Sequence, residues 1–287
     1  MNSAAILHLL CLYSILFSGC SKEAPSSNTE RSNTIAYEQL RNIDGVLYAS
    51  NQEAPYTGIS HSFYPNGKKR DEINIKEGKW HGLTTIWHAN GKKFLTVYFK
   101  SGEKDGLQTE WRENGMQSSE TSFKDGKKHG IEMCWYENGQ MSSKTSFKGG
   151  EMDGLETLWY ENGQMRSQYS FMLGRRHGLT TEWDRKGIMQ SESRYKDGRR
   201  DGISTSFYPD GRTATVINYV NGRYHGEYTL YQPPGKLAYR GQYNEGKEVG
   251  IWIFYDEAGN VESTREYPNK VPVKDQPSTP TSEDAPR

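Results

Sequence analysis

This chain of 287 residues has few cysteines, no net charge and few long apolar runs. Of its three cysteines only Cys134 lies beyond the N-terminal segment, so a disulfide framework is excluded. Lys plus Arg and Asp plus Glu both number 36, which gives a formal net charge of zero and no basic field to attract nucleic acid. The apolar run from Ala4 to Phe17 has the length of a signal-peptide core and is too short for a comfortable membrane span.

Motifs of catalysis and of metal binding are missing as well. The sequence has no Gly-x-Ser-x-Gly elbow, no phosphate-binding loop and no paired carboxylates in a setting for acid–base chemistry. Cysteine and histidine do not occur at metal-ligand spacing. We therefore expect a protein that is not an enzyme and that holds neither a cofactor nor a metal.

Residues 1–20 form a separate export segment, which ends in the sequence LFSGC at Cys20. This ending resembles the lipobox of bacterial lipoproteins, where the cysteine is lipidated and becomes the mature N-terminus. The resemblance implies a lipid anchor at Cys20 and attachment to a bacterial membrane, and Ser21 favours the outer membrane and its periplasmic face. An ordinary signal peptide and an uncleaved anchor are the alternatives.

Two further segments have the composition of unstructured chain. Residues 21–36 are rich in Ser, Asn and Glu without an apolar period, which predicts a flexible tether. Residues 268–287 contain five prolines, which predicts a disordered tail.

Glycine recurs between these segments at an unbroken interval of 24 residues. We count positions in each unit from its first glycine, which is position 0. The nine glycines at position 0 are Gly58, Gly82, Gly106, Gly130, Gly154, Gly178, Gly202, Gly226 and Gly250. A second glycine at position 9 is expected to close a turn, for example Gly67, Gly91, Gly115, Gly139, Gly163, Gly187 and Gly211. This period is typical of a repeat array, which offers an extended surface and not a buried pocket.

Alternation of residue types inside the unit predicts strands. Position 5 is aromatic in all nine units and position 17 in eight, and Asn-Gly or Asp-Gly follows the first aromatic as a hairpin signal. We therefore predict an all-β repeat array of 24-residue hairpins, which form an elongated, right-handed twisted antiparallel meander over residues 58–267.

A three-residue loop closed by a glycine bulge is favoured over a two-residue loop, because it pairs position 5 with the more apolar position 11. Continuing this register places position 3 opposite position 13 and puts positions 1, 3, 5, 11, 13, 15 and 17 on one face. The candidate binding-face aromatics on it are Trp87, Trp111, Trp135, Trp159, Trp183, Phe99, Phe123, Phe147 and Phe171. The same stripe can equally serve as the core of the array.

Position 23 alternates between His and Asp from His81 to His225. Members of this row are two strands apart, about 9.6 Å, which is too far for shared metal coordination. We therefore expect each of them to close a turn. Cys134 at position 4 is expected to be a lone, exposed thiol without an activating neighbour.

The units 130–153 and 154–177 combine Gly-Leu/Ile, Trp-Tyr, Asn-Gly-Gln-Met and a later Phe-Lys/Met. They resemble the variant MORN repeat, which in bacteria occurs in the YwqK-type antitoxin family. The resemblance extends over residues 58–267, and residues 37–57 resemble the cap that precedes such arrays. The resemblance to this family implies a protein-binding role of the antitoxin or immunity type. The protein partner would then be exported, like the chain itself. A cell-envelope scaffold or glycan binder and a MORN-like lipid-associated protein are the alternatives.

Overall fold

The computed structural model describes residues 33–269, and nearly all of them lie in strands or tight turns. Cys20, the predicted signal peptide, most of the predicted tether and almost all of the predicted tail lie outside the described residues. Nineteen strands belong to one sheet and two more form a small second sheet. The all-β prediction and the prediction of repeating antiparallel hairpins are both confirmed.

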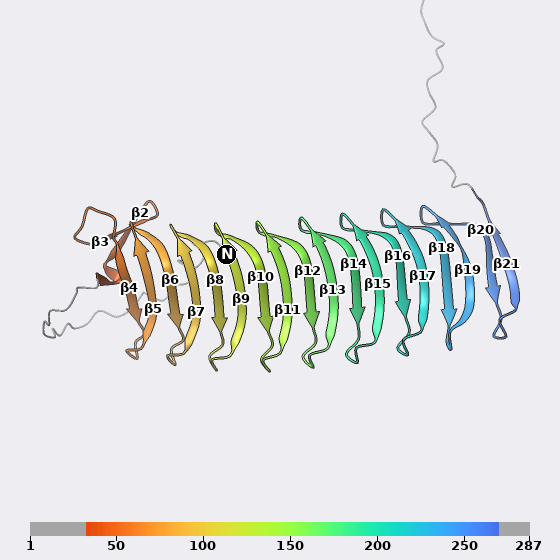
Figure 1. Ribbon diagram of the computed structural model, residues 1–287, viewed down its shortest axis with the longest axis horizontal. Helices are drawn as coiled ribbons and strands as arrows, with labels where there is room; N and C mark the ends of the chain where they lie inside the picture. The colour runs from red at the N-terminus through yellow and green to blue at the C-terminus, as the bar shows by residue number, and fades with distance from the viewer. Residues whose placement is uncertain (1–32, 270–287) are drawn as a thin grey trace, which may run out of the picture. The chain divides into compact units, whose positions relative to one another are not determined.

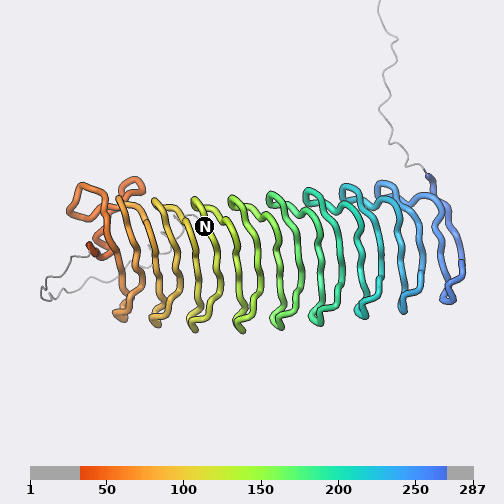
Figure 2. Tube along the Cα trace, viewed as in Figure 1, coloured from red at the N-terminus to blue at the C-terminus, as the bar shows by residue number. Residues whose placement is uncertain are grey.

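The chain divides into two compact units, with the division at β13 (Met165–Met172). The strands of the first unit are β1 (Thr34–Ala36), β2 (Leu40–Ile43), β3 (Val46–Ala49), β4 (Gly58–Phe63), β5 (Lys69–Lys76), β6 (Lys79–Trp87), β7 (Lys93–Lys100), β8 (Glu103–Trp111), β9 (Gln117–Lys124), β10 (Lys127–Trp135), β11 (Met141–Lys148) and β12 (Glu151–Trp159). Those of the second unit are β14 (Arg175–Trp183), β15 (Met189–Lys196), β16 (Arg199–Phe207), β17 (Thr213–Val220), β18 (Arg223–Gln232), β19 (Lys236–Asn244), β20 (Lys247–Tyr255) and β21 (Val261–Tyr267). From β4 onwards, consecutive strands within each unit run antiparallel and are joined by turns at alternate ends of the strands (Figures 1 and 2).

The turn inside each hairpin has the predicted three-residue form. In the hairpin of β10 and β11 the Tyr136 N–H donates to the Gln140 carbonyl at 2.8 Å, and Trp135 pairs with Met141. Gly139 adopts a φ of 82°, a left-handed conformation that a residue with a Cβ adopts at a cost. The predicted pairing of positions 5 and 11 is therefore confirmed.

The predicted continuation of this register is wrong, because a β-bulge follows the turn. Cys134 pairs with Ser143 and not with Ser142, so one residue of the second strand has no partner. The same shift occurs next to Trp87, Trp111 and Trp183. An extra residue reverses the alternation of faces, so positions 13, 15 and 17 share a face with positions 4 and 2, opposite to position 5.

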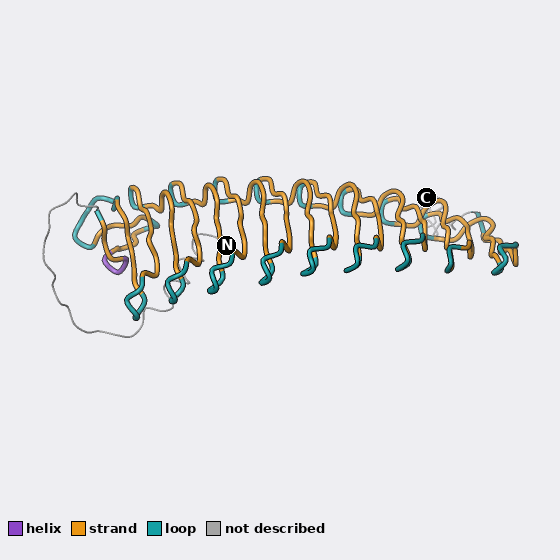
Figure 3. Tube along the Cα trace, turned by 60° about the horizontal axis from the view of Figure 1, so that its bottom comes forward, coloured by secondary structure: helices purple, strands orange, loops and turns teal. Residues whose placement is uncertain are grey.

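The turn between hairpins is tighter and uses two left-handed residues in succession. Asp125 and Gly126 have φ values of 48° and 75°, as a type I′ turn requires. The Gly126 N–H also donates to the Lys104 carbonyl of the preceding hairpin at 2.9 Å. Figure 3 shows that, within each unit, these turns lie at one end of the strands and the longer turns at the other end.

Within each unit, side chains of the longer turns bond one hairpin to the next. The Tyr64 hydroxyl donates to the Trp87 carbonyl at 2.7 Å, and the Tyr136 hydroxyl donates to the Trp159 carbonyl at 2.6 Å. Asn90 Nδ2 makes the equivalent bond to the next turn at 2.8 Å. The turn residues therefore both reverse the chain and hold consecutive repeats at a fixed spacing.

An N-terminal segment closes the first end of the array. Strands β2 and β3 form a separate hairpin, and the Leu47 N–H donates to the Gly78 carbonyl at 2.8 Å. Strand β1 pairs in parallel with β4. The predicted tether therefore extends too far, because its last residues, Thr34–Ala36, belong to the sheet.

Candidate functional site: the two faces of the sheet

The sheet has two chemically different faces, which we call the Trp face and the Phe face. The Trp face carries positions 1, 3 and 5, and the Phe face carries positions 2, 4, 13, 15 and 17. In the hairpin of β8 and β9, Phe123 pairs with Gly106, and Glu110 pairs with Ser119, while the next residue, Trp111, points the other way. The nine candidate aromatics therefore do not form one surface: the five Trp residues line one face and the four Phe residues line the other.

Long basic side chains partly cover the tryptophans of the Trp face. Lys69 Nζ lies 5.5 Å from the ring centre of Trp87, and Lys93 Nζ lies 5.9 Å from that of Trp111. Each lysine sits at position 11 of the preceding hairpin and makes a cation–π contact. All five candidate tryptophans, including Trp135, Trp159 and Trp183, are half-buried.

An exposed aliphatic row lies beside the tryptophans on the same face. In the first unit, Leu83, Leu107 and Leu155 at position 1 are exposed by 36%, 40% and 49%. We call these three residues the Leu row. In the second unit position 1 holds the exposed Leu179, Ile203 and Ile251. A repeated exposure of large aliphatic side chains on one face is typical of an interaction surface.

The Phe face begins in the first unit with an apolar stretch that the N-terminal cap covers. Ile73, Val97 and Phe99 are exposed by no more than 3%, and Leu47 and Tyr56 of the cap belong to the same buried cluster. Trp80 packs edge-on against Phe99, with ring centres 4.9 Å apart. This stretch is the main hydrophobic core among the described residues.

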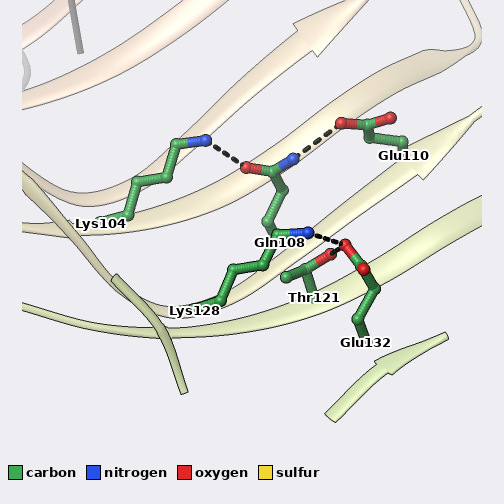
Figure 4. A network of polar contacts seen from close by, with 6 residues as sticks. All are labelled: Lys104, Gln108, Glu110, Thr121, Lys128 and Glu132. Atoms are coloured by element: carbon green, nitrogen blue, oxygen red, sulfur yellow. Dashed lines mark hydrogen bonds and ion pairs between the residues drawn. The ribbon is translucent and has the colours of Figure 1, made fainter. Parts of the chain in front are cut away.

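Further along the first unit the Phe face becomes polar (Figure 4). Lys104 Nζ donates to Gln108 Oε1 at 2.6 Å, and Gln108 Nε2 donates to Glu110 Oε1 at 2.7 Å. The next repeat has a similar arrangement, in which Glu132 Oε1 accepts from Lys128 and from Thr121. Hydrogen-bonded polar side chains can fill a sheet face without an apolar cover.

Lys104 is the most enclosed charged group of this polar stretch, with 7% of its surface exposed. Burial lowers the pKa of its ammonium group, while the nearby Glu110 acts in the opposite direction. Its Nζ lies 4.7 Å from the ring centre of Phe123, and Lys128 has the same distance to Phe147. These contacts place two of the predicted phenylalanines beneath lysines. Phe171 holds the same position in β13 and is half-buried.

In the second unit the Phe face becomes aromatic over β17 to β21. The side chains are linked by ring-centre distances of 5.0 to 6.1 Å. We call this group the tyrosine cluster, and its members are Tyr219, Tyr224, Tyr228, Tyr239, Tyr243, Trp252, Phe254 and Tyr267. This cluster is not among the predicted site residues, although the aromatics at positions 2, 13 and 17 of the last units are a signal for it in the sequence.

Trp252 lies at the centre of the tyrosine cluster and is 2% exposed. Its indole ring occupies the space where a Cβ at residue 241 would stand, so Gly241 is needed opposite it. Tyr243 meets the indole edge-on at 5.1 Å. Burial raises the pKa of the Tyr228 phenol, and hydrogen bonding to Tyr239 adds to that rise.

The predicted turn glycines occupy left-handed backbone positions. The φ values at Gly67, Gly91, Gly115, Gly139, Gly163, Gly187 and Gly211 lie between 78° and 90°. Glycine tolerates these values because it has no Cβ.

The His and Asp residues at position 23 have the predicted turn role. His129 Nδ1 accepts from the Gly149 N–H at 3.4 Å, and Asp201 Oδ2 accepts from the Asn221 N–H at 3.0 Å. Among residues 33–269, no three His, Cys, Asp or Glu side chains lie close enough together to hold a metal ion. Cys134 is a free thiol on the Phe face and is half-buried, not fully exposed as predicted.

Comparison with known families identifies the repeat. Three segments of the chain, residues 128–148, 152–172 and 248–269, match the family described as MORN repeat variant. Each match spans one hairpin of the geometry described above. The matches support a MORN-repeat protein, and repeats of this kind suggest a role in binding. A search of curated proteins found no significant match. Among the described residues, the structure contains no helix with the length and apolarity needed to cross a membrane.

Proposed function

We propose that this chain is a non-catalytic, protein-binding repeat lipoprotein that holds its partner on the Trp face. The observation that carries the proposal is the Leu row, because three large aliphatic side chains stand exposed at the same position of three repeats, on one face of the sheet. Exposed aliphatic residues with polar neighbours are a common composition of protein interfaces.

The resemblance to YwqK-type proteins supports a finer proposal, an antitoxin or immunity-type role in which the array occludes another protein. The lipobox-like sequence at Cys20 supports a location at a bacterial membrane, with the outer membrane and its periplasmic face favoured. The partner would then be an exported or periplasmic protein. The zero net charge makes nucleic acid an unsuitable ligand.

Crosslinking in whole cells followed by mass spectrometry tests the binding surface. The variant Leu83→Ser, Leu107→Ser, Leu155→Ser removes the aliphatic side chains of the Leu row, and we expect it to lose the crosslinked partner. A matched control, Met172→Ser, Leu173→Ser, Val220→Ser, removes three exposed apolar side chains outside the row and should keep the partner. Equal recovery of the partner by both variants would contradict binding through the Leu row.

The anchor is tested separately. Cys20→Ser should abolish labelling of the chain by a radioactive fatty acid and release it from the membrane fraction. Retention in the membrane by the unlabelled variant would show that an uncleaved signal segment anchors the chain.

A further inference from the structure

The two ends of the Phe face differ in what covers them. At the first end, the N-terminal cap folds over Ile73, Val97 and Phe99 and leaves them almost fully buried. In the second unit, Trp252 at the centre of the tyrosine cluster is 2% exposed, whereas most of the surrounding rings are only half-buried and Tyr224 is 39% exposed. A surface of this composition is stabilised when an apolar segment removes it from water.

The chain continues directly from this cluster. Tyr267 is itself a member, and twenty residues follow it in the sequence, of which 270–287 lie outside the described part. They begin with Lys270-Val271-Pro272-Val273 and contain two further prolines by residue 280. Extended segments that contain proline bind surfaces lined by aromatic rings, because the polyproline II conformation is preformed and loses little entropy.

The segment is long enough to reach across the whole cluster. From β21 to β17 the sheet has four strand steps, which amount to about 19 Å. Eleven residues from Lys270 to Pro280 span about 34 Å in a polyproline II conformation. The segment can therefore turn back over β21 and cross the whole cluster. Because it is covalently attached, its effective concentration at the cluster is high.

We propose that the tyrosine cluster is a docking surface for the chain's own segment 270–287, with Val271, Pro272 and Val273 against the aromatic rings. In this proposal the segment covers the aromatic rings of the second unit, as the N-terminal cap covers Ile73, Val97 and Phe99 in the first unit. The proposal uses a different face from the Leu row and does not depend on the protein partner.

Hydroxyl-radical footprinting with mass spectrometry tests the proposal on the full chain. We compare the labelling of Tyr224, Tyr239 and Phe254 with that of Tyr98, which is 48% exposed in the first unit and serves as the reference. Deleting residues 270–287 should raise labelling of the cluster several-fold and leave Tyr98 unchanged. Labelling of the cluster that is equal with and without the segment would overturn the proposal.

Two variants of unchanged length separate docking from an effect of truncation. Val271→Ser, Pro272→Ser, Val273→Ser should reproduce the increased labelling of the deletion. The matched control Ala285→Ser, Pro286→Ser should keep the protection of the full chain. Strong labelling of the full chain that only purified peptidoglycan suppresses would also overturn the proposal, and would make a glycan the occupant.

Discussion

Trp252 is buried because residue 241 has no side chain. At position 15 other repeats carry side chains as large as Ile73 and Tyr169, whereas Gly241 leaves room for an indole from the neighbouring strand. A small residue at position 15 and a large residue at position 2 of the next repeat fill the same space that a large and a small residue fill elsewhere, for example Ile73 and Thr84. The volumes of Gly241 and Trp252 on adjacent strands are therefore complementary.

Gly241→Ala should destabilise the second unit by about 1–3 kcal/mol, because the new Cβ overlaps the indole ring of Trp252. Thermal unfolding followed by far-UV circular dichroism measures the loss. Adding Trp252→Ser, which restores the small residue found at Ser204, should make the Gly241→Ala change close to neutral. If Gly241→Ala costs the same with and without Trp252, the steric explanation is wrong.

The stability of the second unit is expected to depend on pH in the alkaline range, because of the phenols of the tyrosine cluster. Burial raises the pKa of Tyr228 and of Tyr243 above the ordinary value of 10.0. The folded state then holds the proton more tightly than the unfolded state, so this stabilisation is complete below pH 10 and is lost as pH rises above it.

We therefore expect the unfolding temperature to fall above pH 10, with a steeper fall in the wild-type chain than in Tyr228→Phe. Absorbance at 295 nm follows phenol ionisation in the same samples, and Tyr48, outside the cluster, offers the control Tyr48→Phe. Parallel pH profiles for the wild-type chain and Tyr228→Phe would contradict a role of this phenol.

At the scale of single elements, the two kinds of turn have different structural roles in a repeat. The longer turn introduces the bulge that decides which face each residue occupies, and its side chains bond to the next hairpin. The tight turn requires two left-handed residues, and four of the eight tight turns between hairpins place Asp, Asn or Gly first, while Glu77, Ser101, Leu173 and Glu245 hold this place in the others. Leu173 is an exception, because a bulky residue adopts a φ of 49° there.

Leu173→Asn should stabilise the protein by about 1 kcal/mol, because Asn tolerates the left-handed conformation that leucine resists. Gly149 holds the equivalent position two strands earlier, with a φ of 61° and no atom near its would-be Cβ. The reciprocal change Gly149→Leu should therefore cost about 1–2 kcal/mol. Urea unfolding compares the two. Opposite signs are expected, and a loss of stability in both variants would contradict the argument.

At the scale of the whole molecule, stability comes from contacts between neighbouring repeats and not from one central core. Beyond the capped first stretch, the Phe face is filled by polar bonds around Gln108 and then by the tyrosine cluster. Within each unit, a repeat touches the one before and the one after it, which is the arrangement of a repeat protein.

Removing residues 130–153, one whole period, should leave a folded chain with a slightly lower unfolding temperature. His129 would then precede Gly154, as a position 23 residue precedes a position 0 glycine elsewhere. Removing only residues 130–141 breaks the period and should cause a much larger loss of strand signal in far-UV circular dichroism. Similar spectra for the two deletions would argue against a strict repeat.

The period, the hairpins and the first turn register were all predictable, because glycine spacing and residue alternation act locally. The face of the phenylalanines was not. One unpaired residue, such as Ser142, moves Phe147 to the other side of the sheet. An alternating sequence is compatible with either face, so the alternation alone does not show on which side Phe147 lies. The aromatics at positions 2, 13 and 17 are visible in the last units of the sequence, but that they share one face follows only once this bulge is located.

A regular array of β-hairpins can be deduced from the amino-acid sequence alone, because each turn depends on residues within a few positions of its glycine. Which side chains contact one another is known only from the folded sheet. That outcome depends on bulges and on pairing between strands from different repeats, where a shift of one residue exchanges the two faces.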